Sequence, residues 1–417
     1  MGKCPIVLDR TGQDVHAEGE RIRAQGPVTL VEVPGGFHAW SITNYEIAKS
    51  VLVDPRFAKN AREHWPAFIN GEVPPDWELI TWVVMDNMNT HDGADHDRLR
   101  KLVSHAFTTR QVEKARPMIE KIVARLLDDI AATPAGEPVD VKSRYFYPLA
   151  ATVICDLFGV PESARAGVLQ GSVVNSKTTN SAEQAEANLH QWQSAMTDLV
   201  ETKRREPGDD LTTTLISARE EGDTPLTDEE TVGTLHLMFG AGTETVSNVL
   251  AHAVLDLLTH PDQLELVRTG RYGWDAVFQE TVRKEGAVAQ LPFRYATEDV
   301  EIGGVTVAKG DLVLIGYSAI GRDPELHGET AGEFDITRAD KTNLGFGYGP
   351  HRCLGMPLAT LQAAIALPAL FERFPDLRMA VDVGELEPQG TFIMNGHREV
   401  PVLVSAAPVA AVPVPAA

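Results

Sequence analysis

One cysteine of the chain lies in a glycine-rich stretch that leads into an apolar run. The stretch is Phe346-Gly347-Tyr348-Gly349-Pro350-His351-Arg352-Cys353-Leu354-Gly355, and the apolar run extends from Leu358 to Phe374. Glycines adopt positive φ and let a flat ligand approach the backbone closely. A cysteine at a helix N-terminus has its thiolate favoured by unpaired N–H groups and the helix dipole. Such a thiolate, with one side open, suits axial ligation of a metal in a large planar group; the alternative is a buried structural cysteine.

Two other pairs have spacings that bring their side chains together on a helix. His96 and Arg100 are four residues apart, so they share one helix face. They suit a ligand with two negative charges, although a His and an Arg at this spacing more often form a solvated face. Glu280 and Arg283 face together at i, i+3, which by itself indicates an ordinary surface ion pair.

A long helix is predicted from Thr227, where Glu230 completes a capping box, to Thr259. Its middle, Gly240-Ala241-Gly242-Thr243-Glu244-Thr245, contains two glycines that cost about 1 kcal/mol each in a helix interior. Residues of low helix propensity in the middle of an otherwise strong helix suggest a functional role for this segment. Small residues let a flat ligand lie against the helix, and the Thr245 hydroxyl can bond back to a carbonyl. The alternative is close helix packing through small residues.

Taken together and in this order, the four motifs resemble those of cytochromes P450, and the resemblance covers roughly Asp9 to Ser405. Gly93 to Arg100 and Leu370 to Pro375 resemble the soluble actinobacterial members that oxidise natural products and steroids. The resemblance implies a mainly α fold with small β-sheets (α+β). In this triangular prism, haem lies between the long helix and the cysteine loop with the helix after it. Lys284-Glu285 departs from the family pattern, since an aromatic residue usually follows Arg283.

The resemblance also implies haem b (iron protoporphyrin IX) as cofactor and assigns residues to it. Cys353 would ligate the iron, Thr245 would steady bound dioxygen and its protons, and Glu244 would be the acid beside it. The other haem-binding residues implied are His96, Arg100, Arg294 and His351 toward the propionates, with Phe346, Gly347, Ala241 and Gly355 against the ring. Glu280, Arg283 and Arg338 would form a structural network behind the thiolate loop.

Substrate contacts are predicted from three further segments. Arg62 to Thr90 is long, irregular and rich in Trp and Met, which is typical of a lid or binding loop, with plain packing as the alternative. Ala287 to Leu291 and Thr391 to Asn395 would also line the pocket. The predicted pocket residues are Met85, Met88, Leu237, Ala241, Val288, Ala289, Leu291, Ile393 and Met394.

Composition narrows the class of protein. Lys and Arg number 37 against 59 Asp and Glu, a net charge of −22 over 417 residues, which argues against nucleic-acid binding. Three cysteines are too few for a disulfide framework, which fits a reducing cytoplasm. No apolar run reaches the roughly 18 residues of a membrane span. We therefore predict a cytoplasmic protein without membrane contact.

No linker divides the chain, so we predict one domain over residues 1–405, followed by an Ala, Pro and Val tail at 406–417 that is disordered. Periodicity and turn residues predict two β-hairpins and a series of helices. The hairpins are Val28–Val33 with Phe37–Thr43 and Val300–Ile302 with Val305–Val307; the helices are Asn44–Val53, Asp95–Phe107, Val112–Ala131, Leu149–Phe158, Pro161–Arg205 and Trp274–Lys284.

The resemblance implies a haem-thiolate monooxygenase that uses O2 to hydroxylate or otherwise oxidise a bulky hydrophobic secondary metabolite or steroid-like molecule. The alternatives are oxidative coupling or cyclisation of an aromatic or diketopiperazine-type substrate, and a haem sensor without turnover, which has no need of Glu244 and Thr245. No flavin or iron–sulfur motif is present, so a ferredoxin and its reductase would supply electrons. The ferredoxin would dock on a basic patch of this chain, on the cysteine side. The candidate residues for that patch are Arg98, Lys101, Arg110, Lys114, Lys341 and Arg352; the alternative is that they are ordinary solvated surface.

Overall fold

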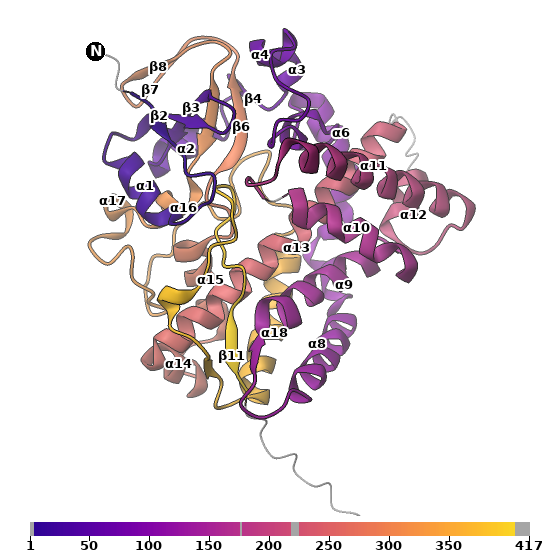
Figure 1. Ribbon diagram of the computed structural model, residues 1–417, viewed down its shortest axis with the longest axis vertical. Helices are drawn as coiled ribbons and strands as arrows, with labels where there is room; N and C mark the ends of the chain where they lie inside the picture. Colours follow the sequence, from indigo (N-terminus) through magenta and orange to yellow (C-terminus); the bar gives the residue numbers. More distant parts are fainter. Residues whose placement is uncertain (1–3, 176, 218–224, 405–417) are drawn as a thin grey trace, which may run out of the picture.

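The computed structural model describes residues 4–175, 177–217 and 225–404. Figure 1 shows a β-rich part at the upper left, and helices that make up most of the rest. The segment 406–417 lies outside the described residues, so the disordered tail and the single domain over 1–405 stay predictions. Within the described ranges, no helix combines the length and the apolar character needed to cross a membrane.

The largest sheet joins strands of the first sixty residues to strands between residues 291 and 315, in the order β1-β2-β3-β9-β6-β4. The predicted hairpin at its centre is confirmed, with Val28 opposite Ile42 and Val33 opposite Phe37. Smaller sheets have the orders β10-β11-β5 and β7-β8, and the latter is the second predicted hairpin. The strands are β1 (Ile6–Val7), β2 (Val28–Val33), β3 (Phe37–Ile42), β4 (Phe57–Ala58), β5 (Pro138–Asp140), β6 (Leu291–Ala296), β7 (Val300–Ile302), β8 (Val305–Val307), β9 (Leu312–Ile315), β10 (Arg378–Met379) and β11 (Pro401–Leu403).

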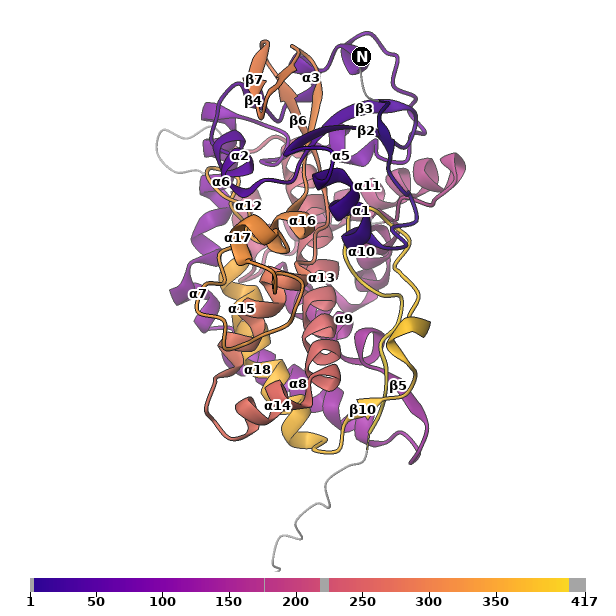
Figure 2. The ribbon, with the colours of Figure 1, turned by 90° about the vertical axis from the view of Figure 1, so that its left-hand side faces the viewer.

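Helices form the larger layer, below the sheet in Figure 2. Those of the first half are α1 (Val15–Arg23), α2 (Tyr45–Val51), α3 (Ala61–His64), α4 (Pro66–Ile69), α5 (Thr81–Val84), α6 (Gly93–Ser104), η1 (His105–Phe107), α7 (Thr109–Glu113), α8 (Arg116–Ala131), η2 (Lys142–Phe146), α9 (Tyr147–Leu157), α10 (Glu162–Asn175) and α11 (Ala182–Arg205). Those of the second half are α12 (Leu211–Ser217), α13 (Asp228–Thr259), α14 (Pro261–Arg268), α15 (Trp274–Glu285), α16 (Tyr317–Gly321), α17 (Pro324–His327), α18 (Met356–Arg373) and η3 (Val383–Glu385).

The helix α13 runs through the middle of the helical layer, with α9, α10, α11 and α15 packed around it. The predicted capping box is confirmed: the Thr227 hydroxyl accepts from the Glu230 N–H at 3.1 Å, and a Glu230 carboxylate oxygen accepts from the Thr227 N–H at 2.8 Å. These bonds satisfy N–H groups that a helix start leaves unpaired. Because it is packed on several sides, α13 is a rigid wall for whatever lies against its middle.

Some predicted elements differ from the structure for local reasons. The helix predicted over Val112–Ala131 is split into α7 and α8, because Pro117 lacks an N–H and its ring clashes with the carbonyl four residues earlier. Helix α12 was not predicted. The stretch from Arg62 to Thr90 contains three short helical segments. Its first half packs against the sheet, where the ring centroids of Trp65 and Trp77 lie 5.6 Å apart in a buried aromatic cluster.

Candidate active site

A cavity of 330 Å³ lies between the middle of α13 and the loop before α18. The wall on α13 runs from His236 to Val249, and the opposite wall consists of residues between Gly345 and Gln362. Residues 81–90 and 282–291 close the remaining sides. The volume falls within the roughly 300–1,000 Å³ of small-molecule pockets. The two sequence motifs with the strongest chemical content therefore face one cavity.

Cys353 is exposed at the surface of this cavity. Its N–H donates to the carbonyl of Phe346 at 2.8 Å, which closes the loop on itself. Burial among protein atoms raises the pKa of the thiol, whereas the N–H groups of Gly355 and Met356, which donate to the sulfur, lower it together with two nearby arginines. These N–H groups belong to the start of α18, so the helix stabilises a thiolate that faces the cavity.

Glycine is required at two points of this loop. Gly347 and Gly349 have φ of +68° and +73°, a region that side chains with a Cβ rarely occupy. A Cβ on Gly349 would also lie 3.0 Å from the carbonyl oxygen of Leu52. The curvature of the loop, and with it the position of Cys353, depends on these glycines.

The irregular run in α13 serves both the cavity and the packing. The Thr245 hydroxyl donates to the carbonyl of Ala241 at 2.6 Å, and both residues line the cavity. On the other side, a Cβ on Gly242 would lie 3.1 Å from Ile154, and one on Gly240 would lie 3.2 Å from Trp192. The small residues thus open the cavity wall and also let neighbouring helices approach, so both interpretations of the sequence apply.

Glu244 is buried beside Thr245 and lines the cavity. Its Oε2 accepts a hydrogen bond from Gln389 Nε2 at 2.7 Å. Lys142 Nζ lies 3.9 Å from the same oxygen. Neither partner was identified from the sequence, because each is more than a hundred residues away along the chain.

The predicted pair on α6 reaches the cysteine loop. Arg100 lines the cavity and donates to the carbonyl of Arg352 at 2.6 Å. The rings of His96 and His351 have centroids 4.2 Å apart, and His96 Nε2 is buried without a hydrogen-bond partner among the described residues. His351 also lines the cavity, 3.8 Å from a carboxylate oxygen of Asp92.

Two further basic side chains lie behind this group. Arg294 on β6 is buried, donates to the carbonyl of Phe57 at 2.9 Å, and is not part of the cavity wall. Lys59, which sequence reasoning missed, is also buried, and burial together with the nearby Arg294 lowers its pKa to about 7. Asp92 accepts from the backbone N–H of Lys59 at 2.6 Å. Basic groups therefore outnumber this acid, which suits an anionic ligand.

Most of the predicted pocket residues line the cavity, namely Met85, Met88, Leu237, Ala241, Val288, Leu291 and Met394. Ala289 and Ile393 are not on its wall. The Ala289 N–H donates to the Ile393 carbonyl at 2.7 Å, and both side chains are buried in the core. Because side chains alternate along extended backbone, their neighbours Val288 and Met394 face the cavity instead.

Sequence reasoning missed an aromatic part of the wall. The ring of His236 stacks on Trp192 with centroids 4.4 Å apart, and its Nδ1 lies 2.7 Å from the sulfur of Met85. Burial lowers the pKa of His236 to about 4, so its imidazole is neutral at pH 7. Helical spacing could have identified His236 as a wall residue, because it lies one turn before Gly240 on the same face of α13.

The loop that carries Met85 and Met88 also meets α13 at the backbone of Gly233. Asn87 Nδ2 donates to the carbonyl of Gly233 at 3.2 Å. A Cβ on Gly233 would lie only 2.0 Å from the carbonyl oxygen of Asp86, so the two backbones are in direct contact. Only glycine allows this approach.

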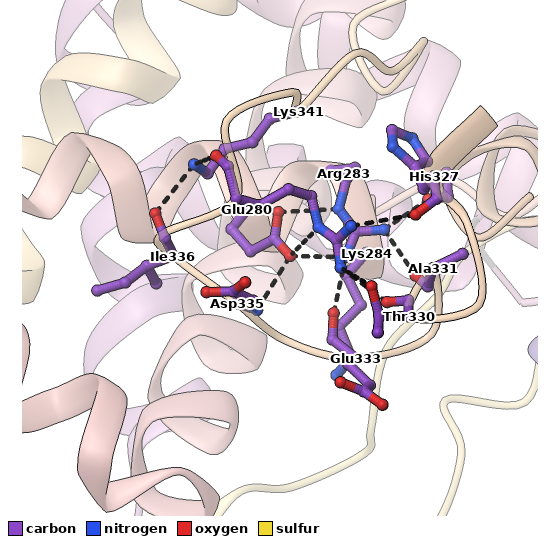
Figure 3. A network of polar contacts seen from close by, with 12 residues as sticks. Glu280, Arg283, Lys284, His327, Thr330, Ala331, Glu333, Asp335, Ile336 and Lys341 are labelled. Atoms are coloured by element: carbon purple, nitrogen blue, oxygen red, sulfur yellow. Dashed lines mark hydrogen bonds and ion pairs between the residues drawn. The ribbon is translucent and has the colours of Figure 1, made fainter. Parts of the chain in front are cut away.

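Figure 3 shows the surroundings of Glu280 and Arg283. Both are fully buried, so this pair is not a surface ion pair: Arg283 Nε and Nη2 donate to the Glu280 carboxylate at 2.8 and 2.6 Å. Arg338 Nε adds a longer contact of 3.4 Å to the same carboxylate. The remaining donors of Arg283 bond at 2.7–2.8 Å to the carbonyls of Gly321, Ala331 and Glu333.

A family model described as Cytochrome P450 matches residues 172–269 and 274–395. The chain belongs to the cytochrome P450 family. It is 54% identical over 399 residues to 2-hydroxy-5-methyl-1-naphthoate 7-hydroxylase from Streptomyces carzinostaticus, covering 96% of this chain and 97% of that protein. It is 36% identical to the cytochrome P450 monooxygenase PikC from Streptomyces venezuelae, covering 95% and 94%. Its fold matches CYP154A1 from Streptomyces coelicolor A3(2) with a TM-score of 0.91 and 45% identity, covering 96% and 100%.

This P450 is thus an enzyme of the monooxygenase class, and its family uses haem. The cavity residues fit that group. The loop that carries Cys353 forms one wall, and a helix that exposes Ala241 forms the other. The unpartnered His96 Nε2 and the basic side chains around Asp92 suit the acidic side chains of a porphyrin.

Proposed function

We propose that this P450 uses O2 to hydroxylate a bulky, largely apolar natural product, with haem b ligated by Cys353. The observation that carries the proposal is that Cys353 and Thr245, from two different walls, line one cavity that is largely apolar. When bound, haem supplies the oxygen-activating iron, and a thiolate ligand favours cleavage of the O–O bond.

The chain's own residues would then bind, orient and supply protons. His96, Arg100 and His351 would hold the carboxylates of the cofactor at one edge of the cavity, with Arg294 and Lys59 as more distant charges. Thr245 would present its hydroxyl to the cavity, fixed by its bond to Ala241. Glu244 would be the acid that replenishes protons beside it.

For the substrate we propose a fused-ring aromatic acid of the naphthoate type. Support comes from the relative at 54% identity, which is named as a hydroxylase of a methylated hydroxynaphthoate. It also comes from the wall, where Trp82, Met85 and Met88 offer flat or adaptable apolar surface. The amides of Asn87 and Asn89, which also line the cavity, are among the polar groups able to orient a carboxylate or hydroxyl.

For electron supply we propose a ferredoxin that docks near the cysteine loop. Arg110, Lys114 and Arg352 are exposed, as this role requires. Two of the residues first considered are unsuited to it. Arg98 forms an ion pair with Glu230 on α13, and the Lys341 ammonium donates to the carbonyls of Ile336 and Arg338.

Three measurements on the purified protein test the proposal. The ferrous carbonyl spectrum should carry the signature of thiolate ligation, and the Cys353→His variant should lose that signature while still binding haem. A panel of naphthoic acids should perturb the haem spectrum more than steroids or macrolides do. Mass spectrometry of the product should show the gain of one oxygen atom. Loss of two hydrogens without oxygen would instead support oxidative coupling, and a wild-type spectrum without thiolate character would refute the haem assignment.

A further inference from the structure

The chain makes a widened helical turn just before α9. Lys142–Phe146 is a π-helix, in which the N–H of Tyr147 donates to the carbonyl of Lys142. Pro148 has no N–H and cannot donate to Arg144, so an α-helical ladder is interrupted at this point. Single π-turns occur frequently at functional sites. The residue at the start of this turn is Lys142.

Lys142 is a buried lysine, which is rare without a charged partner. Its Nζ donates to the carbonyl of His397 at 2.6 Å and lies 3.9 Å from Glu244 Oε2. Burial lowers the pKa of Lys142, while Glu244 and Asp140 act against this shift. The charged and titratable groups around Lys142 and Glu244 are Asp140, Tyr147, Lys177 and His397. Of the two acids that act on Lys142, Glu244 also lines the cavity.

Glu244 is held asymmetrically. Its Oε2 faces both Gln389 Nε2, at 2.7 Å, and the Lys142 ammonium. The Gln389 side chain is itself fixed, because its amide oxygen Oε1 accepts a hydrogen bond from Asn248 Nδ2 at 2.8 Å. Glu244 Oε1 accepts no hydrogen bond from residues 4–175, 177–217 or 225–404. One oxygen of this carboxylate is therefore clamped, and the other is left to exchange protons.

We propose that Lys142 is a positioning residue for proton delivery: the π-turn holds its ammonium beside Glu244 Oε2, so that Glu244 takes up and releases protons at Oε1. Gln389 is the second arm of this clamp. The proposal rests on the proposed role of Glu244 as the acid beside Thr245. A purely structural lysine would support the His397 carbonyl and would leave proton delivery unchanged.

A double-mutant cycle tests the pairing without any turnover. The melting temperature of the ferric protein is compared for wild type, Lys142→Met, Glu244→Gln and the double variant. Lys142→Met leaves a buried carboxylate without its cation, so it should lower the melting temperature, and Glu244→Gln in the same chain should restore part of that loss. Strictly additive losses would show that the two residues are not coupled and would overturn the proposal.

The functional arm measures product formed per NADH consumed across a pH series. Lys142→Met should lower this ratio by about tenfold and change its pH profile. Positioned proton transfer contributes roughly 10²–10⁴-fold to a reaction rate, and the loss of a positioning residue should remove a part of that contribution. Lys142→Arg should keep the ratio within about twofold, because the charge remains. The matched control is Lys177→Met, which removes an exposed lysine that lowers the pKa of Lys142; its loss keeps Lys142 charged and should leave the ratio unchanged.

A Lys142→Met enzyme with wild-type coupling at every pH would overturn the proposal. If the wild-type protein hydroxylates no substrate, the proposed function fails instead. The thermal cycle still decides whether Lys142 and Glu244 act as a pair in that case.

Discussion

Glu280 and Glu285 stand little more than one turn apart on α15, yet the buried ion networks around them differ in how fully their polar atoms are bonded. Around Glu280, each of the five N–H groups of Arg283 has an acceptor within 2.9 Å (Figure 3). Such a network has one arrangement and no spare donor. It ties α15 to the loop that runs from α17 toward the cysteine.

Around Glu285 the contacts are as close but less complete. Its carboxylate meets His16 Nε2 at 2.8 Å and Lys284 Nζ at 2.9 Å, and Lys284 also bonds Asp256 at 2.7 Å. His252 Nδ1 lies 3.9 Å from the same carboxylate. Three buried atoms here have no hydrogen-bond partner in the described part of the chain, namely His16 Nδ1, His252 Nε2 and Asp256 Oδ2.

The difference shows which network responds to pH. Burial raises the pKa of Asp256 to about 6 and lowers that of His252 to about 3. In the Glu280 network, His327 contributes its backbone carbonyl, which accepts from Arg338 Nη1 at 3.3 Å, and among the described residues no histidine ring bonds to Glu280, Arg283 or Arg338. We therefore expect the first network to set the rigidity of the fold and the second to set its response to acid.

The largest effect should come from Arg283→Lys. A lysine offers three donors at one point where five are bonded in a plane, so the buried Glu280 carboxylate loses most of its compensation. The expected loss in the free energy of unfolding is about 3–5 kcal/mol, measured by denaturant titration. Arg116→Lys, at an exposed pair with Glu113, is the control and should cost under about 0.5 kcal/mol. A loss below about 1 kcal/mol for Arg283→Lys would contradict the comparison.

A smaller and pH-dependent effect is expected from His252→Asn. The folded-state pKa of His252 is depressed to about 3 from an ordinary value of 6.5, so its contribution to stability is present above pH 6.5 and is lost as the pH falls toward 3. At pH 5 this amounts to about 2 kcal/mol relative to pH 7.5. Asp256 acts in the opposite direction, because its raised pKa favours the folded state as the pH falls through 6.

Comparing wild type with His252→Asn isolates the histidine contribution. Unfolding free energies at pH 5 and 7.5 should show the variant gaining about 2 kcal/mol on wild type at the lower pH. The exposed His38 provides the control, since His38→Asn should leave this difference unchanged. Parallel pH profiles for wild type and His252→Asn would show that His252 does not sense acid.

The smallest effect should come from Arg338→Met, at the edge of the Glu280 network. Its contact with the Glu280 carboxylate is 3.4 Å, and Arg283 still compensates that charge when Arg338 is removed. The expected cost is about 1 kcal/mol, the same at pH 5 and 7.5. A cost as large as that of Arg283→Lys, by the same titration, would mean that the network has two essential arginines.

Spacing along the sequence sufficed where the partners are near each other in the chain. The capping box of α13, the Glu280–Arg283 pair and the bond from Thr245 to Ala241 all join residues three or four apart. Helical periodicity fixes such contacts almost regardless of the rest of the fold. The family resemblance then supplied the fold and the class of enzyme.

Contacts that depend on tertiary folding were not predictable in this way. Lys142 and Gln389 meet Glu244 from distant segments, and Lys59 joins the basic group through a short strand. Ala289 and Ile393 were placed on the wrong face, because a segment's position does not reveal which of its alternating side chains points inward. The ion pair of Arg98 with Glu230 was missed for a related reason, since Glu230 lies on another helix.

The backbone contact between Gly233 and Asp86 bears on how this enzyme could be re-engineered. Because that junction has no space for even one methyl group, it fixes the position of the loop over the cavity. Chemists who seek new products should leave position 233 untouched and randomise positions 82, 85, 88 and 89. Altered selectivity would then arise from exchanged side chains on a fixed frame, with little loss of foldable variants.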